Sequence, residues 1–326
     1  MKLRSATFIV PGGLQRSTGG NVYDRVMIEA LRRRGWRVDV SDGAPIRATD
    51  VGIQDSLAMP AGPPAAAKHL VPLLHQLPSE ANARPSWRAP EREVLRSACL
   101  VVTVSQHLAE RVSRETDAPV TVVSPGWDRA CASRLADGDS VVCVANAAPR
   151  KGVADAIDAF TRARLHEARF VLAGDPRRDP LESGRIDAFA SSLGPDLILD
   201  GVVDPSALAH RYSTARVFVS ASRYEGWPIA VAEAMASTLP IVAFDVAGVR
   251  ELVRDGEDGI LADVGDIDGL ARGLRRLWRD PSLRRRMGLA AQRRARGWPT
   301  WEEAGRQFVH MLESHVDGDA YAEGAE

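Results

Sequence analysis

The chain has 326 residues, of which 45% are hydrophobic and 26% are charged, and its formal net charge is −1. This length is enough for two domains of ordinary size, and the composition is that of a soluble globular protein. The near-neutral charge argues against a general nucleic-acid binder, because phosphate contacts require a basic excess.

The ends of the chain and its cysteines give the expected location. Residues 1–10 contain no long apolar core and are followed at once by the sequence Pro-Gly-Gly, so we expect no secretory signal peptide. No run approaches the roughly 18 apolar residues of a membrane-spanning helix. The three cysteines, Cys99, Cys131 and Cys143, lack metal-ligand spacing and are expected to be buried thiols. An odd number of cysteines fits a reducing compartment, so we expect a cytoplasmic protein.

The first half of the chain alternates apolar strands with helices. A strand over 6–10, a glycine-rich loop over 11–20, a helix over 21–34 and a strand over 36–40 are typical of a doubly wound sheet. Further strands are predicted at 50–53, 70–74, 100–104 and 120–123, with a loop over 59–67. Helices are predicted over 91–98 and after Ser105, which is a good helix cap.

Two features of this half are candidate ligand contacts. Gly19 and Gly20 lie where strand gives way to helix, and glycine there lets a phosphate approach the backbone; a plain tight turn is the alternative. His75 follows the strand over 70–74, at the edge of a parallel sheet where ligands bind. A lone histidine is otherwise more often a structural residue.

The second half repeats the pattern. A polar segment over 129–140 is expected to link two domains, and a second doubly wound sheet begins with the strand over 141–144. Two such domains that face one another leave a cleft suited to a small molecule.

The segment over 217–240 predicts a buried strand, a polar loop with Glu225 and Gly226, and a helix that opens near Pro228. The first turn of that helix presents unpaired backbone N–H groups, which suit an anion or sugar hydroxyls. Glu233 lies about two turns along, so the two carboxylates could hold two parts of one ligand. Two solvated glutamates are the alternative on spacing alone.

This segment resembles the signature of the family 4 nucleotide-sugar glycosyltransferases, which have the GT-B fold. The match consists of Glu-Gly-aromatic at 225–227, Glu-Ala at 233–234 and, after a stretch that includes small residues, Pro-Ile-Val at 240–242, with seven residues between the two glutamates. Other segments resemble the family at 124–128, 144–152, 200–204 and 242–251. The resemblance implies two Rossmann-like doubly wound domains around a cleft: an acceptor domain over 1–128, a linker over 129–140, a donor domain over 141–297, and a C-terminal helix that returns to the first domain, then a tail, over 298–326.

The resemblance also implies roles for individual residues. Lys151 would neutralise the diphosphate leaving group, Glu225 would hold the sugar ring, and His75 would face the donor sugar; these three are the predicted catalytic residues. Glu233 would bind the ribose hydroxyls, because one carboxylate accepts from two neighbouring O–H groups. The predicted donor-binding set is Gly19, Gly20, Arg150, Lys151, Gly174, Val203, Glu225, Gly226, Trp227, Ile229 and Glu233.

Two departures from the family pattern affect the expected site. Asn146 stands where the family has a second phosphate-binding arginine, and Arg150 is the candidate to replace it. Pro228 has no N–H, so any amide contact from that position is lost.

The resemblance implies transfer of a sugar, with retention at the anomeric carbon, from a UDP- or GDP-linked donor to an unidentified acceptor. A sugar-nucleotide epimerase or hydrolase of the same fold, or a non-catalytic sugar-nucleotide-binding protein, is the alternative. We see no Asp-x-Asp site for a divalent metal and expect neither a metal nor a cofactor. Nucleic acid is not an expected partner.

Between residues 272 and 296, ten arginines accompany one aspartate, Asp280. The simplest interpretation is a core-packing helix with a solvated basic face. The alternative is a patch that binds an anionic partner or a membrane surface, which would matter if the acceptor is a lipid.

Overall fold

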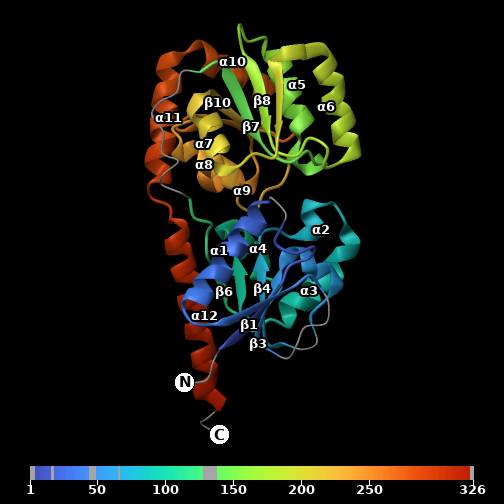
Figure 1. Cartoon of the computed structure of the whole chain (residues 1–326), viewed down its shortest axis with the longest axis vertical. Coiled ribbons are helices and arrows are strands. Elements are labelled where there is room, and N and C mark those ends of the chain that lie inside the picture. The colour runs from blue at the N-terminus through green and yellow to red at the C-terminus, as the bar shows by residue number, and fades with distance from the viewer. Residues whose placement is uncertain (1–3, 16–17, 44–48, 65–66, 128–137, 324–326) are drawn as a thin grey trace. The chain divides into compact units, whose positions relative to one another are not determined.

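The computed structural model describes residues 4–15, 18–43, 49–64, 67–127 and 138–323 (Figure 1). The chain divides into two compact units: Met1–Gly126 with Pro299–Glu326, and Trp127–Trp298. Each unit contains a six-stranded parallel sheet flanked by helices. The prediction of an α/β chain with two Rossmann-like doubly wound domains is confirmed.

The sheet of the first unit has the order β2-β1-β3-β4-β5-β6. Its strands are β1 (Ser5–Ile9), β2 (Arg37–Ser41), β3 (Thr49–Asp55), β4 (Ala67–Leu74), β5 (Val101–Thr103) and β6 (Val120–Val122). Its helices are α1 (Gly19–Arg33), α2 (Pro78–Ala81), α3 (Arg88–Arg96), α4 (Gln106–Val112) and α12 (Trp301–Glu323). Because β2 and β3 lie on opposite sides of β1, the strand order reverses there, and ligands of such sheets bind at the carboxyl ends beside this reversal.

Several boundaries in this unit differ from the prediction. β3 continues to Asp55 because the polar side chains of Gln54 and Asp55 are buried and paired, and not solvated as their polarity suggested. The predicted loop over 59–67 begins inside a 3₁₀ helix, Ser56–Ala61. Ser105 occupies the cap position of α4, but its side chain makes no capping hydrogen bond.

The C-terminal helix α12 begins at Trp301, three residues after the start of the predicted C-terminal segment. Thr300 and Glu303 form a capping box, in which the Glu303 carboxylate accepts from the Thr300 N–H at 2.7 Å and the Thr300 hydroxyl accepts from the Glu303 N–H at 3.2 Å. The helix then continues to Glu323. Within the first unit α12 packs against α1, where Gly305 leaves room for Ala30.

The sheet of the second unit has the order β12-β11-β10-β7-β8-β9. Its strands are β7 (Ser140–Val144), β8 (Arg169–Ala173), β9 (Leu197–Gly201), β10 (Ala215–Ser220), β11 (Ile241–Phe244) and β12 (Gly259–Ala262). Its helices are α5 (Val153–Ala163), α6 (Pro180–Leu193), α7 (Pro205–Thr214), α8 (Ile229–Ala236), α9 (Ala247–Leu252), α10 (Ile267–Arg279) and α11 (Pro281–Ala295). This is the Rossmann order 3-2-1-4-5-6, and the reversal lies between β7 and β10.

Apolar cores cover both faces of this second sheet. Val141 and Val217 point into a core formed with α5, α6 and α10, whereas the next residues, Val142 and Phe218, point into a core formed with α7, α8 and α9. Strands buried on both faces need continuous apolar runs, which explains why the strands of this half were readable from the sequence.

Two predicted features lie partly or wholly outside the described residues. Of the predicted linker 129–140, only residues 138–140 are described, and Ser140 already belongs to β7. Cys131 also lies outside the described residues. Cys99 is half-buried, with its Sγ 3.4 Å from the Leu70 carbonyl, whereas Cys143 is buried as expected, and burial raises its pKa to about 12. Among the helices that the structure describes, none is long and apolar enough to cross a membrane.

Candidate functional site

The candidate site of the second unit lies where the strand order reverses. β7 and β10 are neighbours in the sheet, so the loops that follow them, residues 145–152 and 221–228, leave the same edge side by side. The first loop carries Lys151 and the second carries Glu225. Parallel pairing thus brings together two predicted residues that are 74 positions apart in the sequence.

Lys151 and Glu225 form a close ion pair. The Lys151 Nζ lies 2.5 Å from Glu225 Oε1, and the two side chains are 24% and 8% exposed. Burial favours the neutral carboxyl, but the charges of Lys151 and Arg150 outweigh it and hold the pKa of Glu225 below its ordinary value. Burial lowers the pKa of Lys151, against the opposing charge of Glu225. The structure therefore keeps a partly desolvated ammonium group at the edge of the sheet.

Arg150 belongs to the same cluster. Its Nη1 lies 3.9 Å from Glu225 Oε2 and donates to the Tyr224 carbonyl at 3.5 Å. Its own carbonyl accepts a backbone hydrogen bond from Arg223 at 2.8 Å. The guanidinium thus adds a second cation beside Glu225, in the region where the sequence lacks the expected arginine at Asn146.

Asn146 has a structural partner. Its side-chain oxygen accepts from the Asp175 N–H at 2.8 Å, which ties the loop after β7 to the loop after β8. Gly174 allows this contact, because its φ is +138° and an added Cβ would lie 2.2 Å from the Ala145 carbonyl oxygen. Both residues therefore shape the backbone beside Lys151.

Two glycines permit close approach around Glu225. An added Cβ at Gly152, whose φ is +57°, would lie 2.2 Å from the Ala221 carbonyl oxygen. An added Cβ at Gly248 in α9 would lie 2.3 Å from the carbonyl oxygen of Glu225 itself. The Glu225 loop is thus packed backbone to backbone on two sides.

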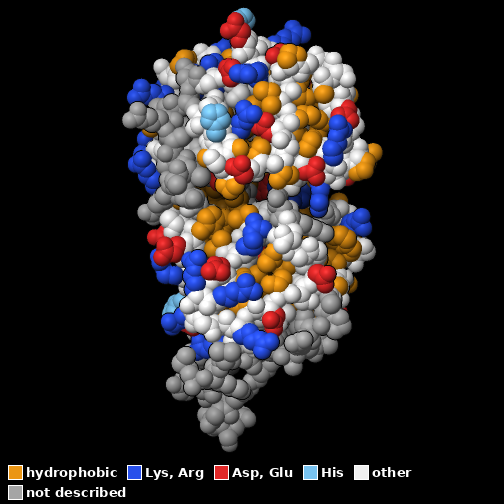
Figure 2. Space-filling model, in the orientation of Figure 1, with side chains coloured by type: hydrophobic (Ala, Val, Ile, Leu, Met, Phe, Trp, Pro, Cys, Tyr) orange, Lys and Arg blue, Asp and Glu red, His pale blue; other side chains and the backbone are white. Residues whose placement is uncertain are grey.

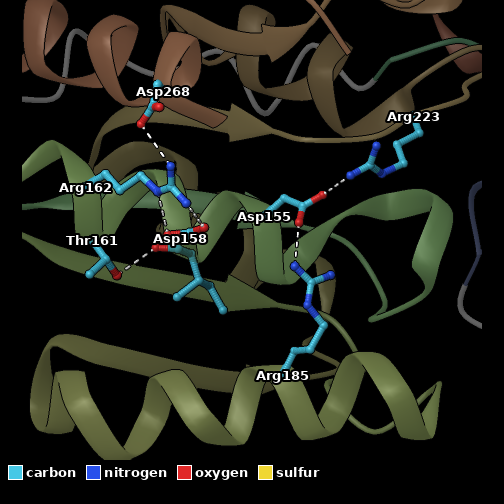
Figure 3. Close-up of polar contacts among 8 residues, drawn as sticks. Asp155, Asp158, Thr161, Arg162, Arg185, Arg223 and Asp268 are labelled. Atoms are coloured by element: carbon cyan, nitrogen blue, oxygen red, sulfur yellow. Dashed lines mark hydrogen bonds and ion pairs between the residues drawn. The ribbon is translucent and has the colours of Figure 1, made fainter. Parts of the chain in front are cut away.

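A buried aspartate anchors the same loop from α5. Asp155 accepts from Arg223 and from Arg185 of α6, each at 2.6 Å, and its side chain is 3% exposed (Figure 3). Nearby, Glu182 accepts from the Ala154 N–H at 2.9 Å and so caps the first turn of α5. These contacts fix the helix that follows Lys151 and the loop that carries Glu225. The sequence analysis did not identify Asp155 or Arg223.

Glu233 lies on α8 and pairs with Tyr212 of α7. Its Oε2 accepts from the Tyr212 hydroxyl at 2.9 Å. Burial raises the pKa of Glu233 to about 7, although the Tyr212 hydrogen bond acts in the opposite direction. The charge of this carboxylate therefore changes near neutral pH.

The remaining predicted residues of the second unit have mixed surroundings. Trp227 packs edge-on against Trp298 at 6.0 Å between ring centroids and supports the adjacent core. Gly226 is buried, Val203 is half-buried, and Ile229 is the first residue of α8. The Trp227 side chain thus packs against its neighbours. Val203, Gly226 and Ile229 lie in or next to loops, where their backbone groups could contact a ligand.

The first unit holds Gly19, Gly20 and His75 near its own strand reversal. The two glycines form the first turn of α1, which begins two residues earlier than predicted. An added Cβ at Gly20 would lie 3.1 Å from the His75 ring, so this glycine makes room for the histidine. His75 Nε2 lies 2.9 Å from Asp24 Oδ1 and 3.6 Å from Asp55 Oδ2.

Sequence reasoning missed both aspartates. One signal was available: Asp24 lies four positions after Gly20 and hence on the same face of α1. Asp55 was missed because β3 was predicted to end at residue 53.

A cavity of about 680 Å³ lies at the opposite ends of the strands from Lys151 and Glu225, by the amino ends of β7, β8 and β10. The arginines of its lining have partners: Arg169 pairs with Asp139, Arg211 pairs with Asp200, and Arg216 lies over the Trp278 ring. Because ligands of such sheets bind at the carboxyl ends of the strands, we place the candidate site at Lys151 and Glu225.

Known glycosyltransferases resemble this chain in sequence. Residues 133–294 match the family model described as Glycosyl transferases group 1. The chain is 35% identical over 157 residues to the alpha-D-kanosaminyltransferase of Streptomyces kanamyceticus, a match that covers 47% of this chain and 40% of that protein. It is 28% identical over 278 residues to the lipopolysaccharide core biosynthesis glycosyltransferase LpsE of Rhizobium meliloti, covering 78% of this chain and 80% of that protein. It is 42% identical over 151 residues to the D-inositol 3-phosphate glycosyltransferase of Thermomonospora curvata, covering 44% and 34%.

Solved structures resemble the whole chain. Sucrose-phosphate synthase from Thermosynechococcus elongatus has a TM-score of 0.84 at 20% identity, covering 97% of this chain and 100% of that one. Anabaena HepE in complex with UDP-glucose has a TM-score of 0.80 at 17% identity, covering 95% and 99%. These likenesses show the GT-B fold. Within that fold, residues 133–294 are similar to the group 1 glycosyl transferases.

Proposed function

We propose that this protein transfers a sugar from a nucleotide-diphosphate donor to an acceptor, with retention at the anomeric carbon. The observation that carries the proposal is the Lys151–Glu225 pair, with Arg150 beside it, at the strand reversal of a Rossmann-order sheet inside the segment similar to the group 1 glycosyl transferases. Negative charge accumulates on the diphosphate as the glycosidic bond breaks, and a preorganised cation stabilises that charge best where water is scarce.

In this proposal Glu225 has two roles. Without a ligand it holds Lys151 in place, and with a donor bound it accepts from sugar hydroxyls while Lys151 and Arg150 turn to phosphate oxygens. Glu233, in its ionised form, accepts from the ribose hydroxyls. Gly19, Gly20, Gly174 and Val203 would contribute backbone contacts.

The donor is proposed to carry UDP or GDP. A solved relative of the same fold, HepE, is described in complex with UDP-glucose, so UDP is the first nucleotide to test. The acceptor is open. The named relatives differ in what they glycosylate, but their names all describe transferases, which favours transfer over the epimerase, hydrolase and non-catalytic alternatives.

We propose turnover without a metal ion. Lys151 and Arg150 supply positive charge where another enzyme would use a divalent cation. Full activity after dialysis against a chelator would support this, and activity lost with the chelator and restored by added Mg²⁺ or Mn²⁺ would contradict it.

A separate proposal is that residues 272–296 associate with a membrane surface. Several of these arginines have internal partners: Arg284 is buried against the Leu277 and Trp278 carbonyls, and Arg294 pairs with Asp258 at 2.5 Å. On the face drawn in Figure 2, basic and acidic side chains are interspersed. Sedimentation with anionic and neutral vesicles would test the proposal; equal recovery with both would contradict it.

The first experiment is a thermal-shift series with UDP, GDP, ADP and dTDP on the wild type and on Glu233→Ala. A ligand specific for the folded state adds about 2.7 kcal/mol of stability at 100 times its Kd. One nucleotide should raise the Tm of the wild type and lose most of that effect in the variant. The matching nucleotide sugar is then incubated with acceptors, and the products are followed by NMR, where the anomeric coupling reports retention. Binding without an acceptor-dependent product would favour the non-catalytic alternative, and an altered nucleotide-linked or free sugar would favour the epimerase or hydrolase.

A further inference from the structure

The first unit contains a buried cluster of ionisable groups, and the predicted donor chemistry accounts for only its histidine. It consists of Asp24 from α1, Asp55 from the end of β3, and His75 directly after β4. Asp24 is fully buried, Asp55 is 4% exposed, and the His75 side chain is 14% exposed. Two carboxylates and an imidazole with this little water must balance their charges among themselves.

The geometry directs one ring nitrogen to both carboxylates. His75 Nε2 lies 2.9 Å from Asp24 Oδ1 and 3.6 Å from Asp55 Oδ2, while Nδ1 takes part in neither contact. Asp55 is itself fixed, because its Oδ1 accepts from the Leu57 N–H at 2.6 Å. A proton on Nε2 is thus shared between two acceptors, and a neutral ring of the opposite tautomer would place a lone pair against them.

Packing holds the ring in this orientation. Gly20 lies against one side of it, and Tyr23 meets it edge-on with ring centroids 5.2 Å apart. Tyr23 is buried and its hydroxyl donates to the Val123 carbonyl at 2.9 Å, so it is anchored independently. Gly20 and Asp24 lie one helical turn apart, so the same face of α1 provides both the space for the ring and the acceptor for its proton.

We propose that Asp24 and Asp55 are positioning residues that hold His75 as an imidazolium with Nε2 fixed, which leaves Nδ1–H as a charged hydrogen-bond donor for an oxygen of the sugar nucleotide. The contact with a ligand rests on the proposed function; the charge and orientation of the ring do not. A charged donor forms stronger hydrogen bonds to anionic or partly anionic oxygens than a neutral imidazole does.

The charged groups that act on the ring support this state. Burial lowers the pKa of His75, but the charge of Asp24, its hydrogen bond and the charge of Asp55 outweigh burial and raise the pKa to about 9. Burial raises the pKa of Asp55 to about 7, against the charge of His75 and with that of Asp24. Burial also raises the pKa of Tyr23 far above its ordinary value, so Tyr23 stays neutral.

The test is a ¹⁵N–¹H NMR titration of the imidazoles in the full-length protein. The chain has seven histidines, and His75→Gln assigns the relevant signal. The wild type should titrate near pH 9. Asp24→Asn should lower the midpoint by about two units or more, to the ordinary value near 6.5 or below, and Asp55→Asn should lower it less because its oxygen is farther from Nε2. Asp39→Asn, an exposed aspartate of β2, is the matched control and should leave the midpoint unchanged.

The kinetic measurement separates positioning from a general structural role. Asp24→Asn should lower kcat/KM about tenfold or more at pH 8, and much of that loss should be recovered at pH 6, where the imidazole regains its proton. If Asp24→Asn does not fold, Asp55→Asn provides both measurements. A structural role alone would give a loss that does not depend on pH.

Two results would overturn the proposal. One is a wild-type His75 that titrates near 6.5 and ignores both asparagine variants. The other is metal binding: the three side chains each offer a ligand atom within 4.8 Å of one another, so Zn²⁺ or Mn²⁺ that binds the wild type but not Asp24→Asn would make His75 a neutral ligand. If no transferase activity is found, the titration still decides the charge of the ring.

Discussion

The Nζ of Lys151 lies 2.5 Å from Oε1 of Glu225, so the cation proposed to meet the donor diphosphate is held by the carboxylate proposed to hold the donor sugar. Neither group is free to act alone. A donor that binds Lys151 must replace the Glu225 oxygens with its own phosphate oxygens. This replacement changes the surroundings of Nζ and can be measured there.

The protonation of Lys151 can be followed because the chain has only three lysines, at positions 2, 68 and 151. Reductive ¹³C-methylation gives few signals, and Lys151→Arg identifies the relevant one. We expect a pKa below the ordinary lysine value, owing to burial, and a still lower pKa in Glu225→Gln, because the counter-charge is lost. Lys151→Ala should lower kcat/KM about 10²- to 10³-fold. A Lys151 signal that titrates like the others would contradict the buried pair.

Glu233 gives a second, pH-dependent prediction. Its pKa is raised by burial to about 7, and ribose binding needs the ionised form, so nucleotide affinity should fall as pH drops below 7. Because the folded-state pKa exceeds the unfolded one, this group's contribution to stability is present below about pH 4.5 and is lost as pH rises through about 7. Calorimetric binding and unfolding from pH 5 to 8 should show the opposite trends.

The controls for Glu233 are Tyr212→Phe and Glu233→Gln. Removing the Tyr212 hydroxyl removes a hydrogen bond that lowers the pKa, so the midpoint for binding should move upward. Glu233→Gln should show weak binding without this titration. Identical pH profiles in all three proteins would mean that another group controls affinity.

Gly248 tests the backbone packing around Glu225. Gly248→Ala places a Cβ 2.3 Å from the Glu225 carbonyl oxygen, and overpacking of this kind costs about 1 to 3 kcal/mol. Chemical denaturation should show that loss, together with weaker nucleotide binding. The matched control is Gly184→Ala in α6, where an added Cβ meets nothing within 4 Å; it should be neutral or stabilising by up to about 1 kcal/mol. Equal effects of the two substitutions would argue against a packed Glu225 loop.

Arg223 tests whether the network in Figure 3 orients the loop. Arg223→Ala should leave stability within about 1 kcal/mol, because Asp155 retains Arg185. It should nevertheless lower kcat/KM about tenfold, since a small displacement of a positioned group is enough for such a loss. Arg162→Ala, which removes ion pairs to Asp158 and Asp268 in the same view, is the control and should keep full activity. If Arg162→Ala lost activity and Arg223→Ala kept it, Arg223 would not be the residue that orients the loop.

Much of the fold was accessible from the sequence because its strands are continuous apolar runs. Residues 141–144 were predicted as a strand and form most of β7. The end of β3 was predicted too early for the opposite reason. Gln54 and Asp55 are polar, and polarity is a poor guide to burial when each side chain has a hydrogen-bond partner. The same error concealed Asp55 as a neighbour of His75.

The sequence by itself determined the two doubly wound patterns and the positions of Lys151, Glu225 and His75, because local periodicity and a local motif encode them. Only the tertiary structure decided which side chains meet. The strand order sets β7 beside β10 and β3 beside β4, and so pairs Lys151 with Glu225 and His75 with Asp55. Such pairings depend on which strands are neighbours in a sheet, and the period of a single strand carries no information about its neighbours.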